Sequence, residues 1–278
     1  MFKRISKKLL TVATRWLNKD LSVADRIALT DFDSLLANIR FADVLLVEGQ
    51  TRVSSIIRTI TMSPWTHAGI YIGPLTGIQD EKLRELILQH YPAQPDEPLV
   101  VEALLGRGTV ITSLAKYRGE HLRICRPKGL SSDDAHAVVA YSISRLGTEY
   151  DVRQLIDLAR FLAPYPFIPK RWHSTLFGES KIAKTVCSTM LAEAFASVRF
   201  PIRPIFRKTA AGDIRMYRRN FRLYTPSDFD YSPYFEIVKA PIFGQQTQLA
   251  YRDLPWEEQD SAETLHDEEL QHSAIKLK

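Results

Sequence analysis

The chain has 278 residues, of which 45% are hydrophobic and 25% are charged. This balance is typical of a globular protein and excludes a fibrous or a wholly disordered chain. No run of about 18 apolar residues occurs, so we expect no transmembrane helix. The net charge of +5 indicates a basic protein, and a basic surface suits an anionic partner or simple solubility.

The N-terminal segment, residues 1–40, is predicted to be helical. In residues 1–19, apolar side chains recur at helical spacing between lysines and arginines, which predicts a basic amphipathic helix. Such a helix can lie on an anionic membrane surface or dock on its own domain, and both alternatives stay open. Its apolar run is short and is broken by Thr and Arg. This pattern argues against a secretory signal. A second helical stretch is expected over residues 21–40.

The middle of the chain alternates between short strands and helices. Short apolar runs that end at Gly or Pro predict strands, and here they are FADVLLVEG (41–49), HAGIYIG (67–73), residues 99–104, GTVITSL (108–114) and HLRICRP (121–127). Two helices are predicted between them, over residues 52–61 and 79–90. Strands in the middle with helices before and after them predict an α+β fold.

The C-terminal part is expected to contain three helices, over residues 131–146, 151–163 and 186–198, with Ser131 or Ser132 as the N-cap of the first. YTPSDFDYSP is predicted to be a turn and strand that end the domain. Two basic stretches with aromatic residues, RPIFRK and RMYRRNFR, could bind nucleic acid. A solvated or lipid-facing surface explains them as easily, and we do not favour nucleic acid.

The last residues differ in charge from the rest of the chain. Residues 251–278 hold eight acidic and three basic side chains, a net charge of −5, so the preceding 250 residues carry +10. Low hydrophobicity and high charge predict disorder. We therefore expect a domain over residues 41–245 and an acidic, disordered tail over residues 246–278.

Two cysteines, Cys125 and Cys187, are far apart in the sequence. Two such thiols do not form a disulfide framework, and no Cys/His cluster has the spacing of zinc ligands. We therefore expect free thiols in a reducing compartment, with no metal and no organic cofactor. The predicted location is the cytoplasm, with peripheral contact to the inner face of the membrane through residues 1–19.

Cys187 stands where the helix over residues 186–198 is predicted to begin. Free N–H groups and the helix dipole favour a thiolate at that position, although a buried structural cysteine is the common alternative. His67 begins a predicted strand beside the small residues Ala68 and Gly69, where a substrate has room. A satisfied surface or core histidine is the alternative.

Glu102 lies inside the apolar strand VVEALL. Burying an acid is costly unless it is paired, and a paired acid can orient an imidazole as the third member of a catalytic triad. The alternative is a strand residue that faces solvent. Cys125, between two arginines in HLRICRP, is interpreted as an ordinary strand residue.

Taken together, these motifs resemble a known family. The order S-x-x-x-H-x-G-I-Y-I-G, V-x-E-A, G-x-x-Y-D and C-S-x-x-x-x-E-A is similar to that of permuted papain-fold hydrolases of the NlpC type, in particular the YiiX/YebB-like group. Lecithin retinol acyltransferases are more distant relatives. The resemblance spans about residues 41–230. In unpermuted relatives the cysteine helix comes first, and here it follows the histidine strand.

The resemblance implies a circularly permuted papain-like fold and a cysteine hydrolase or acyltransferase. It implies Cys187 as the nucleophile, His67 as the general base and Glu102 as the orienting residue. Tyr150 and Ser188 are assigned to substrate or oxyanion binding. The substrate class is an amide or ester: a peptide, a peptidoglycan fragment or a lipid acyl group. A catalytically silent lipid- or protein-binding module of the same fold is the alternative.

Overall fold

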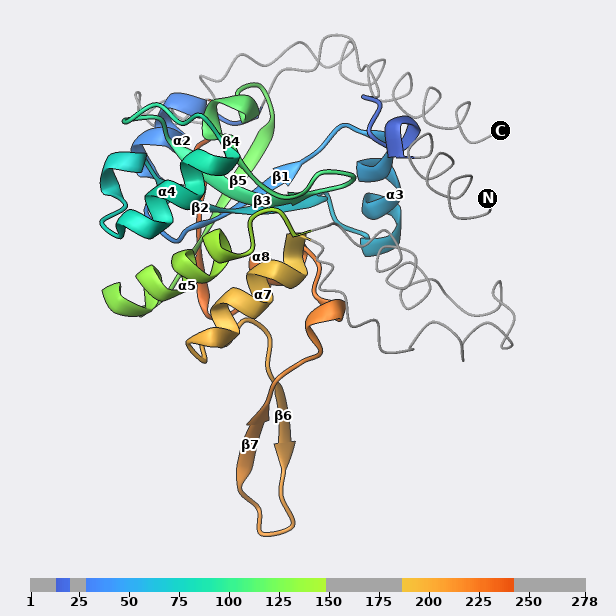
Figure 1. The fold of residues 1–278 in the computed structure, drawn as a ribbon. Coiled ribbons are helices and arrows are strands. Elements are labelled where there is room, and N and C mark those ends of the chain that lie inside the picture. Colours follow the sequence, from blue (N-terminus) through green and yellow to red (C-terminus); the bar gives the residue numbers. More distant parts are fainter. Residues whose placement is uncertain (1–13, 21–28, 149–186, 243–278) are drawn as a thin grey trace, which may run out of the picture. The chain divides into compact units, whose positions relative to one another are not determined.

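The computed structural model describes residues 14–20, 29–148 and 187–242. The chain divides into two compact units, Met1–Ala240 and Pro241–Lys278, and the fold described below belongs to the first. This unit contains a six-stranded antiparallel sheet and several helices (Figure 1), so it is an α+β fold, as expected. The predicted helix over residues 151–163 and the acidic tail lie outside the described residues, as does most of the predicted helix over residues 1–19.

The sheet has the strand order β4-β3-β2-β1-β5-β8, and every neighbouring pair is antiparallel. The first five strands lie near the positions predicted from apolar runs that end in turn residues. The bounds are β1 Val44–Glu48, β2 His67–Gly73, β3 Leu99–Leu104, β4 Gly108–Ser113, β5 His121–Pro127 and β8 Phe235–Val238.

Helices α4 (Glu81–His90), α5 (Ser132–Ser144) and α7 (Cys187–Ser197) share the main core with one face of the sheet. Alternate residues of β2, such as Ala68, Ile70 and Ile72, pack into this core together with Phe195 of α7. The period of two in a strand is what sends these side chains to one face. Helix α7, which is apolar almost all round, is thereby held against β2.

The opposite face of the sheet has a core of its own. Helix α2 (Phe32–Asn38) and the short 3-10 helix η2 (Leu114–Tyr117) cover it, and Leu45, Val100 and Ile124 of the sheet pack there. Because both faces are covered, the central strands β1 and β3 are apolar at consecutive positions rather than at alternate ones. This explains why the predicted strands contained unbroken apolar runs.

Two further elements follow strands of the sheet. Helix α3 (Arg52–Thr61) follows β1, and its N-cap Thr51 accepts a hydrogen bond from the Ser54 N–H. The 3-10 helix η1 (Leu75–Gly77) follows β2. Among the described residues no helix is both long and apolar enough to cross a bilayer.

The sequence predicted no secondary structure for the residues directly after α7, and its prediction of a turn and strand at YTPSDFDYSP was wrong, because a helix lies there and the next strand begins at Phe235. Residues 205–217 form a hairpin of two strands, β6 (Ile205–Lys208) and β7 (Ile214–Tyr217), which makes a separate sheet. The 3-10 helix η4 (Phe221–Leu223) and the helix α8 (Ser227–Asp230) then return the chain to β8. The basic residues in these stretches obscured the strand pattern.

Asp228 fixes the base of this hairpin. Its carboxylate is 3% exposed and accepts hydrogen bonds from Arg203 at 2.7 Å and Arg219 at 2.9 Å, which flank the hairpin on either side. It also accepts bonds from the N–H and hydroxyl of Thr225. A buried carboxylate with this many donors replaces its lost hydration.

We expect Asp228→Ala to lower the free energy of unfolding by about 3 kcal/mol, because two guanidinium groups and a buried hydroxyl lose their acceptor. Urea denaturation followed by circular dichroism measures this change. Asp213→Ala in the hairpin turn is the control and should have little effect, since the Asp213 side chain is exposed. Equal stability of the two variants would contradict the role given to Asp228.

Candidate active site

Cys187 is the first residue of helix α7 and is 5% exposed. The backbone N–H groups of Ala68 and Ser188 donate hydrogen bonds to its sulfur. The first N–H groups of a helix have no partner within that helix, and their partial positive charge stabilises an anion. The start of α7 therefore favours the thiolate form of Cys187.

His67 is the first residue of β2 and lies between Cys187 and Glu102. Its Nε2 is 2.5 Å from Oε2 of Glu102, and the ring also hydrogen-bonds to the Cys187 sulfur. With Nε2 on the carboxylate, Nδ1 is the ring nitrogen left for the thiol. The three side chains that the sequence assigned to catalysis are thus in consecutive contact.

The register of β2 and β3 brings His67 and Glu102 together. Gly69 lies directly opposite Glu102, and His67, two residues before Gly69, projects to the same face of the sheet. A side chain at position 69 would not fit, because its Cβ would lie 2.5 Å from Cγ1 of Val100. Gly69, the first glycine in HAGIYIG, therefore leaves room for the Val100 side chain where β2 and β3 pair at the site.

Glu102 is completely buried, and four side chains compensate its charge. Besides His67, Oε2 accepts a hydrogen bond from the Tyr117 hydroxyl. The other oxygen, Oε1, accepts bonds from the Thr112 hydroxyl at 2.5 Å and from Nζ of Lys116 at 3.1 Å. The carboxylate is thus fixed in orientation and held in its charged form.

Sequence analysis missed these three supporting residues. A signal existed for Thr112: once β3 and β4 are paired, Val110 is opposite Glu102, and Thr112, two residues on, shares its face. Lys116 and Tyr117 belong to η2, which folds back after β4. No periodic pattern predicts that a short 3-10 helix returns two side chains to a strand residue.

The contacts shift the pKa values of the triad in a consistent direction. Burial raises the pKa of Cys187, but its hydrogen bond and charge interaction with His67 and the two N–H groups outweigh burial and lower it. Burial lowers the pKa of His67, but Cys187 and Glu102 outweigh burial and raise it to about 10. The geometry therefore favours a thiolate–imidazolium pair over a wide pH range.

Glu102 and Tyr117 are shifted in opposite directions. Burial raises the pKa of Glu102, but His67, Lys116 and Thr112 hold it well below its usual range. Burial and the neighbouring Glu102 charge raise the pKa of Tyr117 well above 10. Tyr117 is therefore a neutral hydrogen-bond donor to an anionic Glu102.

The sequence analysis also singled out Ser188, Tyr150 and Cys125. The Ser188 hydroxyl is 1% exposed and donates to the carbonyl of Tyr224 at 2.6 Å, so its side chain faces away from a substrate and only its N–H is at the thiol. Tyr150 lies outside the described residues. Cys125 is fully buried in β5, and burial raises its thiol pKa strongly, which agrees with its interpretation as a strand residue.

The triad is not part of a larger cluster of metal ligands. Within residues 14–20, 29–148 and 187–242, no group of three or more His, Cys, Asp and Glu side chains is placed to hold a metal ion. The triad itself offers one thiol, one imidazole and one carboxylate already bonded to four donors.

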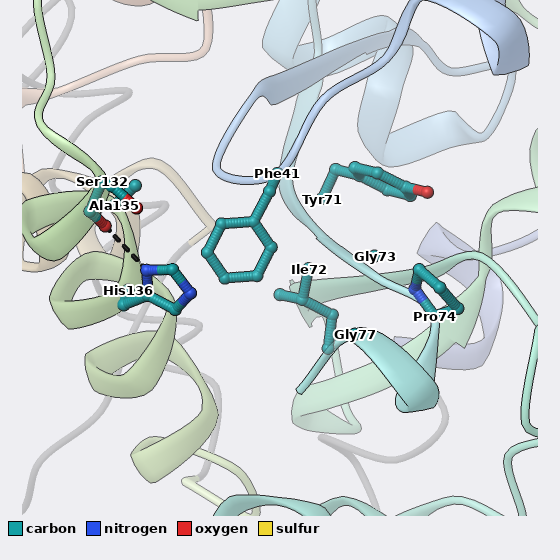
Figure 2. Close-up of a pocket in the computed structure, with 9 residues that line it drawn as sticks. All are labelled: Phe41, Tyr71, Ile72, Gly73, Pro74, Gly77, Ser132, Ala135 and His136. Atoms are coloured by element: carbon teal, nitrogen blue, oxygen red, sulfur yellow. Dashed lines mark hydrogen bonds between the residues drawn. The ribbon is translucent and has the colours of Figure 1, made fainter. Parts of the chain in front are cut away.

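A pocket of about 490 Å³ lies at the other end of β2 (Figure 2). Gly73 and Pro74 line it, and it is about 20 Å from His67, given the rise per residue of a strand. The Phe41 ring lies against the His136 ring at 4.9 Å, and Nδ1 of His136 bonds to the Ser132 carbonyl. The lining contains neither of the cysteines and none of the three residues Cys187, His67 and Glu102, so we assign it no chemistry.

The comparisons with known proteins establish neither a family nor a function for this chain. No family model and no curated protein matches the sequence. Among the solved structures that match is the metalloprotein YiiX from Escherichia coli O157:H7, which aligns with a TM-score of 0.45 and 12% identity. The alignment covers 72% of this chain and 97% of that chain. At this degree of similarity, the function of this chain has to be inferred from its own residues.

We expect Glu102→Gln to lower the pKa of His67 from about 10, because the imidazolium loses its negative partner. Titration of the His67 ring protons by NMR measures this change. Glu85→Gln, an exposed change on α4, is the control. If the His67 pKa were the same in both variants, Glu102 would not be what stabilises the imidazolium.

We also expect Cys187 to react with iodoacetamide at pH values well below those of an ordinary thiol, because its pKa is lowered. His67→Ala should slow alkylation at pH 7 by about thirtyfold, since an unassisted thiol is only a few per cent thiolate there. Mass spectrometry of the labelled peptides gives both rates, with Cys125 as the internal control. Equal reactivity of Cys187 and Cys125 would contradict thiolate activation.

Proposed function

We propose that this chain is a cysteine-dependent hydrolase or acyltransferase that acts on an amide or ester bond. The observation that carries the proposal is the chain of contacts from the Cys187 sulfur through His67 to the buried Glu102. A structural cysteine needs neither a histidine base nor a carboxylate behind that base. Nucleophilic catalysis by a thiol requires both a base and its orienting group.

We further propose that the fold is a circularly permuted papain-like fold of the NlpC type. The support is the arrangement in the chain: the histidine strand β2 and the acid strand β3 come first, and the helix that begins at Cys187 follows them. Helix α7 packs against β2, so the nucleophile still reaches the base across the helix–sheet boundary. This order is the one expected if the cysteine helix is moved to the C-terminal side.

The proposed reaction begins from the thiolate–imidazolium pair, in which Nδ1 of His67 already holds the proton of the Cys187 thiol. The thiolate attacks the carbonyl carbon of the substrate, a C–S bond forms, and the carbonyl electrons move to the oxygen. When the tetrahedral intermediate collapses, the bond to the leaving group breaks and His67 gives it the proton. The product is a thioester on Cys187, and water or another acceptor, deprotonated by His67, then releases the acyl group.

The oxyanion of the intermediate needs hydrogen-bond donors. The backbone N–H of Cys187 is the proposed donor, because it belongs to the first turn of α7, where N–H groups lack partners within the helix. The N–H groups of Ala68 and Ser188 already point at the sulfur and stabilise the thiolate before attack. We assign no role to the Ser188 hydroxyl, which the Tyr224 carbonyl occupies.

The substrate class remains that of the sequence analysis: a peptide, a peptidoglycan fragment or a lipid acyl group. To identify it, we would incubate the protein with a cell lysate and analyse the Cys187 peptide by intact-mass and tandem mass spectrometry. We expect an acyl adduct, linked as a thioester, that hydroxylamine removes. The mass of the adduct gives the substrate class directly.

Two variants separate catalysis from binding alone. Cys187→Ser should carry no adduct that hydroxylamine cleaves as a thioester, and Glu102→Gln should accumulate the adduct at least about tenfold more slowly, because His67 loses its orienting partner. Cys125→Ser is the matched control and should behave as the unmodified chain. If Cys187→Ala supports full cellular function while folded, the silent binding module is the better interpretation.

A further inference from the structure

The β6–β7 hairpin has no role in the proposed reaction and is exposed on both of its faces. All eight of its strand residues are exposed to solvent, and the hairpin extends away from the six-stranded sheet and from α7 (Figure 1). A two-stranded hairpin alone in water is at best marginally stable. Its shape is held instead at its base, where Arg203 and Arg219 share the buried Asp228.

The pairing of the two strands gives the hairpin an apolar face. Because Phe206 is opposite Met216 and Lys208 is opposite Ile214, these four side chains project to the same side. Ile214 is 74% exposed, Phe206 is 57% exposed and Met216 is 54% exposed. Three large apolar side chains gathered on so small an exposed element indicate a surface that is covered in use.

The hairpin is also strongly basic. On its second face Arg207 lies directly opposite Arg215, and like charges opposite each other destabilise a strand pair. In the part of the chain that the structure describes, Arg207, Lys208, Arg215 and Arg218 form no ion pair with an acidic residue. An anionic partner would neutralise these charges and remove the repulsion. We therefore expect the partner of the hairpin to be anionic.

We propose that the β6–β7 hairpin binds the surface of an anionic phospholipid bilayer. Phe206, Ile214 and Met216 lie at the boundary between headgroups and acyl chains, as the apolar face of an interfacial element does. Lys208, which shares this face, extends along its own stem to lipid phosphates, and Arg207 and Arg215 on the other face add electrostatic attraction to the anionic surface. Asp213 in the turn opposes insertion of the tip, so the hairpin lies along the surface.

Other partners fit the same residues less well. Nucleic acid binds through aromatic stacking and basic side chains. Phe206 and Tyr217 of the hairpin are exposed aromatic residues that can stack on bases, whereas the equally exposed Ile205, Ile214 and Met216 cannot. A second copy of this chain would bring two basic hairpins together, at a cost in repulsion. A lipid surface uses both the aliphatic and the basic side chains.

The segment that follows the hairpin makes two hydrogen bonds to the nucleophile helix. After β7, the Phe221 carbonyl accepts a bond from the Thr189 hydroxyl at 3.2 Å, and the Tyr224 carbonyl accepts one from Ser188 at 2.6 Å. Both hydroxyls belong to the first turn of α7, beside Cys187. A bilayer bound through the hairpin is therefore held in a defined orientation to the active site.

The test is vesicle flotation with the full chain, using phosphatidylcholine vesicles with and without phosphatidylglycerol. We expect binding only to the anionic vesicles, and a loss on the order of a hundredfold for Arg207→Gln/Lys208→Gln/Arg215→Gln. Phe206→Ser/Ile214→Ser/Met216→Ser should lose at least tenfold. The matched controls, Lys82→Gln/Arg84→Gln/Lys128→Gln and Met62→Ser/Leu88→Ser, should bind as the unmodified chain does.

A direct readout comes from Phe206→Trp, compared with the unmodified chain because that chain already has four tryptophans. The added fluorescence should shift to the blue on anionic vesicles and be quenched by lipids brominated on their acyl chains. This measurement does not depend on any contribution of residues 1–19 to affinity. The proposal fails if both hairpin triple variants bind like the controls, if only the charge variant loses binding, or if brominated lipid leaves the added fluorescence unchanged.

The vesicle result is independent of the proposed chemistry. Cys187→Ala should bind anionic vesicles as the unmodified chain does, because the hairpin contacts neither the thiol nor its base.

A short single-stranded RNA should not displace the vesicles. Displacement by the RNA at equal charge concentration would overturn the assignment in favour of nucleic acid.

Discussion

A carboxylate that is wholly withdrawn from water must be compensated by the protein, and Glu102 is such a carboxylate. His67, Tyr117, Thr112 and Lys116 all bond to it. An unpaired charge at this depth would cost several kcal/mol, so the positions of β3, β4 and η2 are constrained together. The same constraint fixes the orientation of the His67 ring and, through it, the state of the Cys187 thiol.

The proposed chemistry follows from this arrangement because each element contributes one property. Strand β2 presents the base at its first residue, and Gly69 lets β3 come close enough for the acid to reach that base. Helix α7 presents the thiol at its first residue, where N–H groups are unpaired. The thiolate–imidazolium pair is then stabilised from both sides, by the start of the helix and by the buried acid.

The β6–β7 hairpin belongs to the same unit but has no role in the proposed chemistry, and its proposed role is to bind a membrane. Its strands contribute nothing to either core, and its geometry depends on the buried Asp228 at its base. Exposed apolar side chains promote aggregation, and like charges on opposite strands repel one another. A contact with an anionic bilayer gives both kinds of side chain a use.

The main strands and three of the core helices could be predicted from the sequence, and so could the three residues that the structure brings into contact, Cys187, His67 and Glu102. Apolar runs closed by Gly or Pro are local signals, and the motifs around His67, Glu102 and Cys187 could be recognised from their order along the chain. It did not determine that β6 and β7 pair, because their basic residues mask the alternation. It assigned Ser188 to substrate or oxyanion binding without showing that the Ser188 hydroxyl bonds to the Tyr224 carbonyl.

The surroundings of Glu102, and the atoms through which Cys187, His67 and Glu102 touch, depend on tertiary packing. Thr112, Lys116 and Tyr117 reach the carboxylate because β4 pairs with β3 in one register and η2 then folds back. Those contacts join residues that no local pattern relates. The physical reason is that propensity and periodicity act over a few neighbouring residues, whereas compensation of a buried charge depends on every element that packs around it.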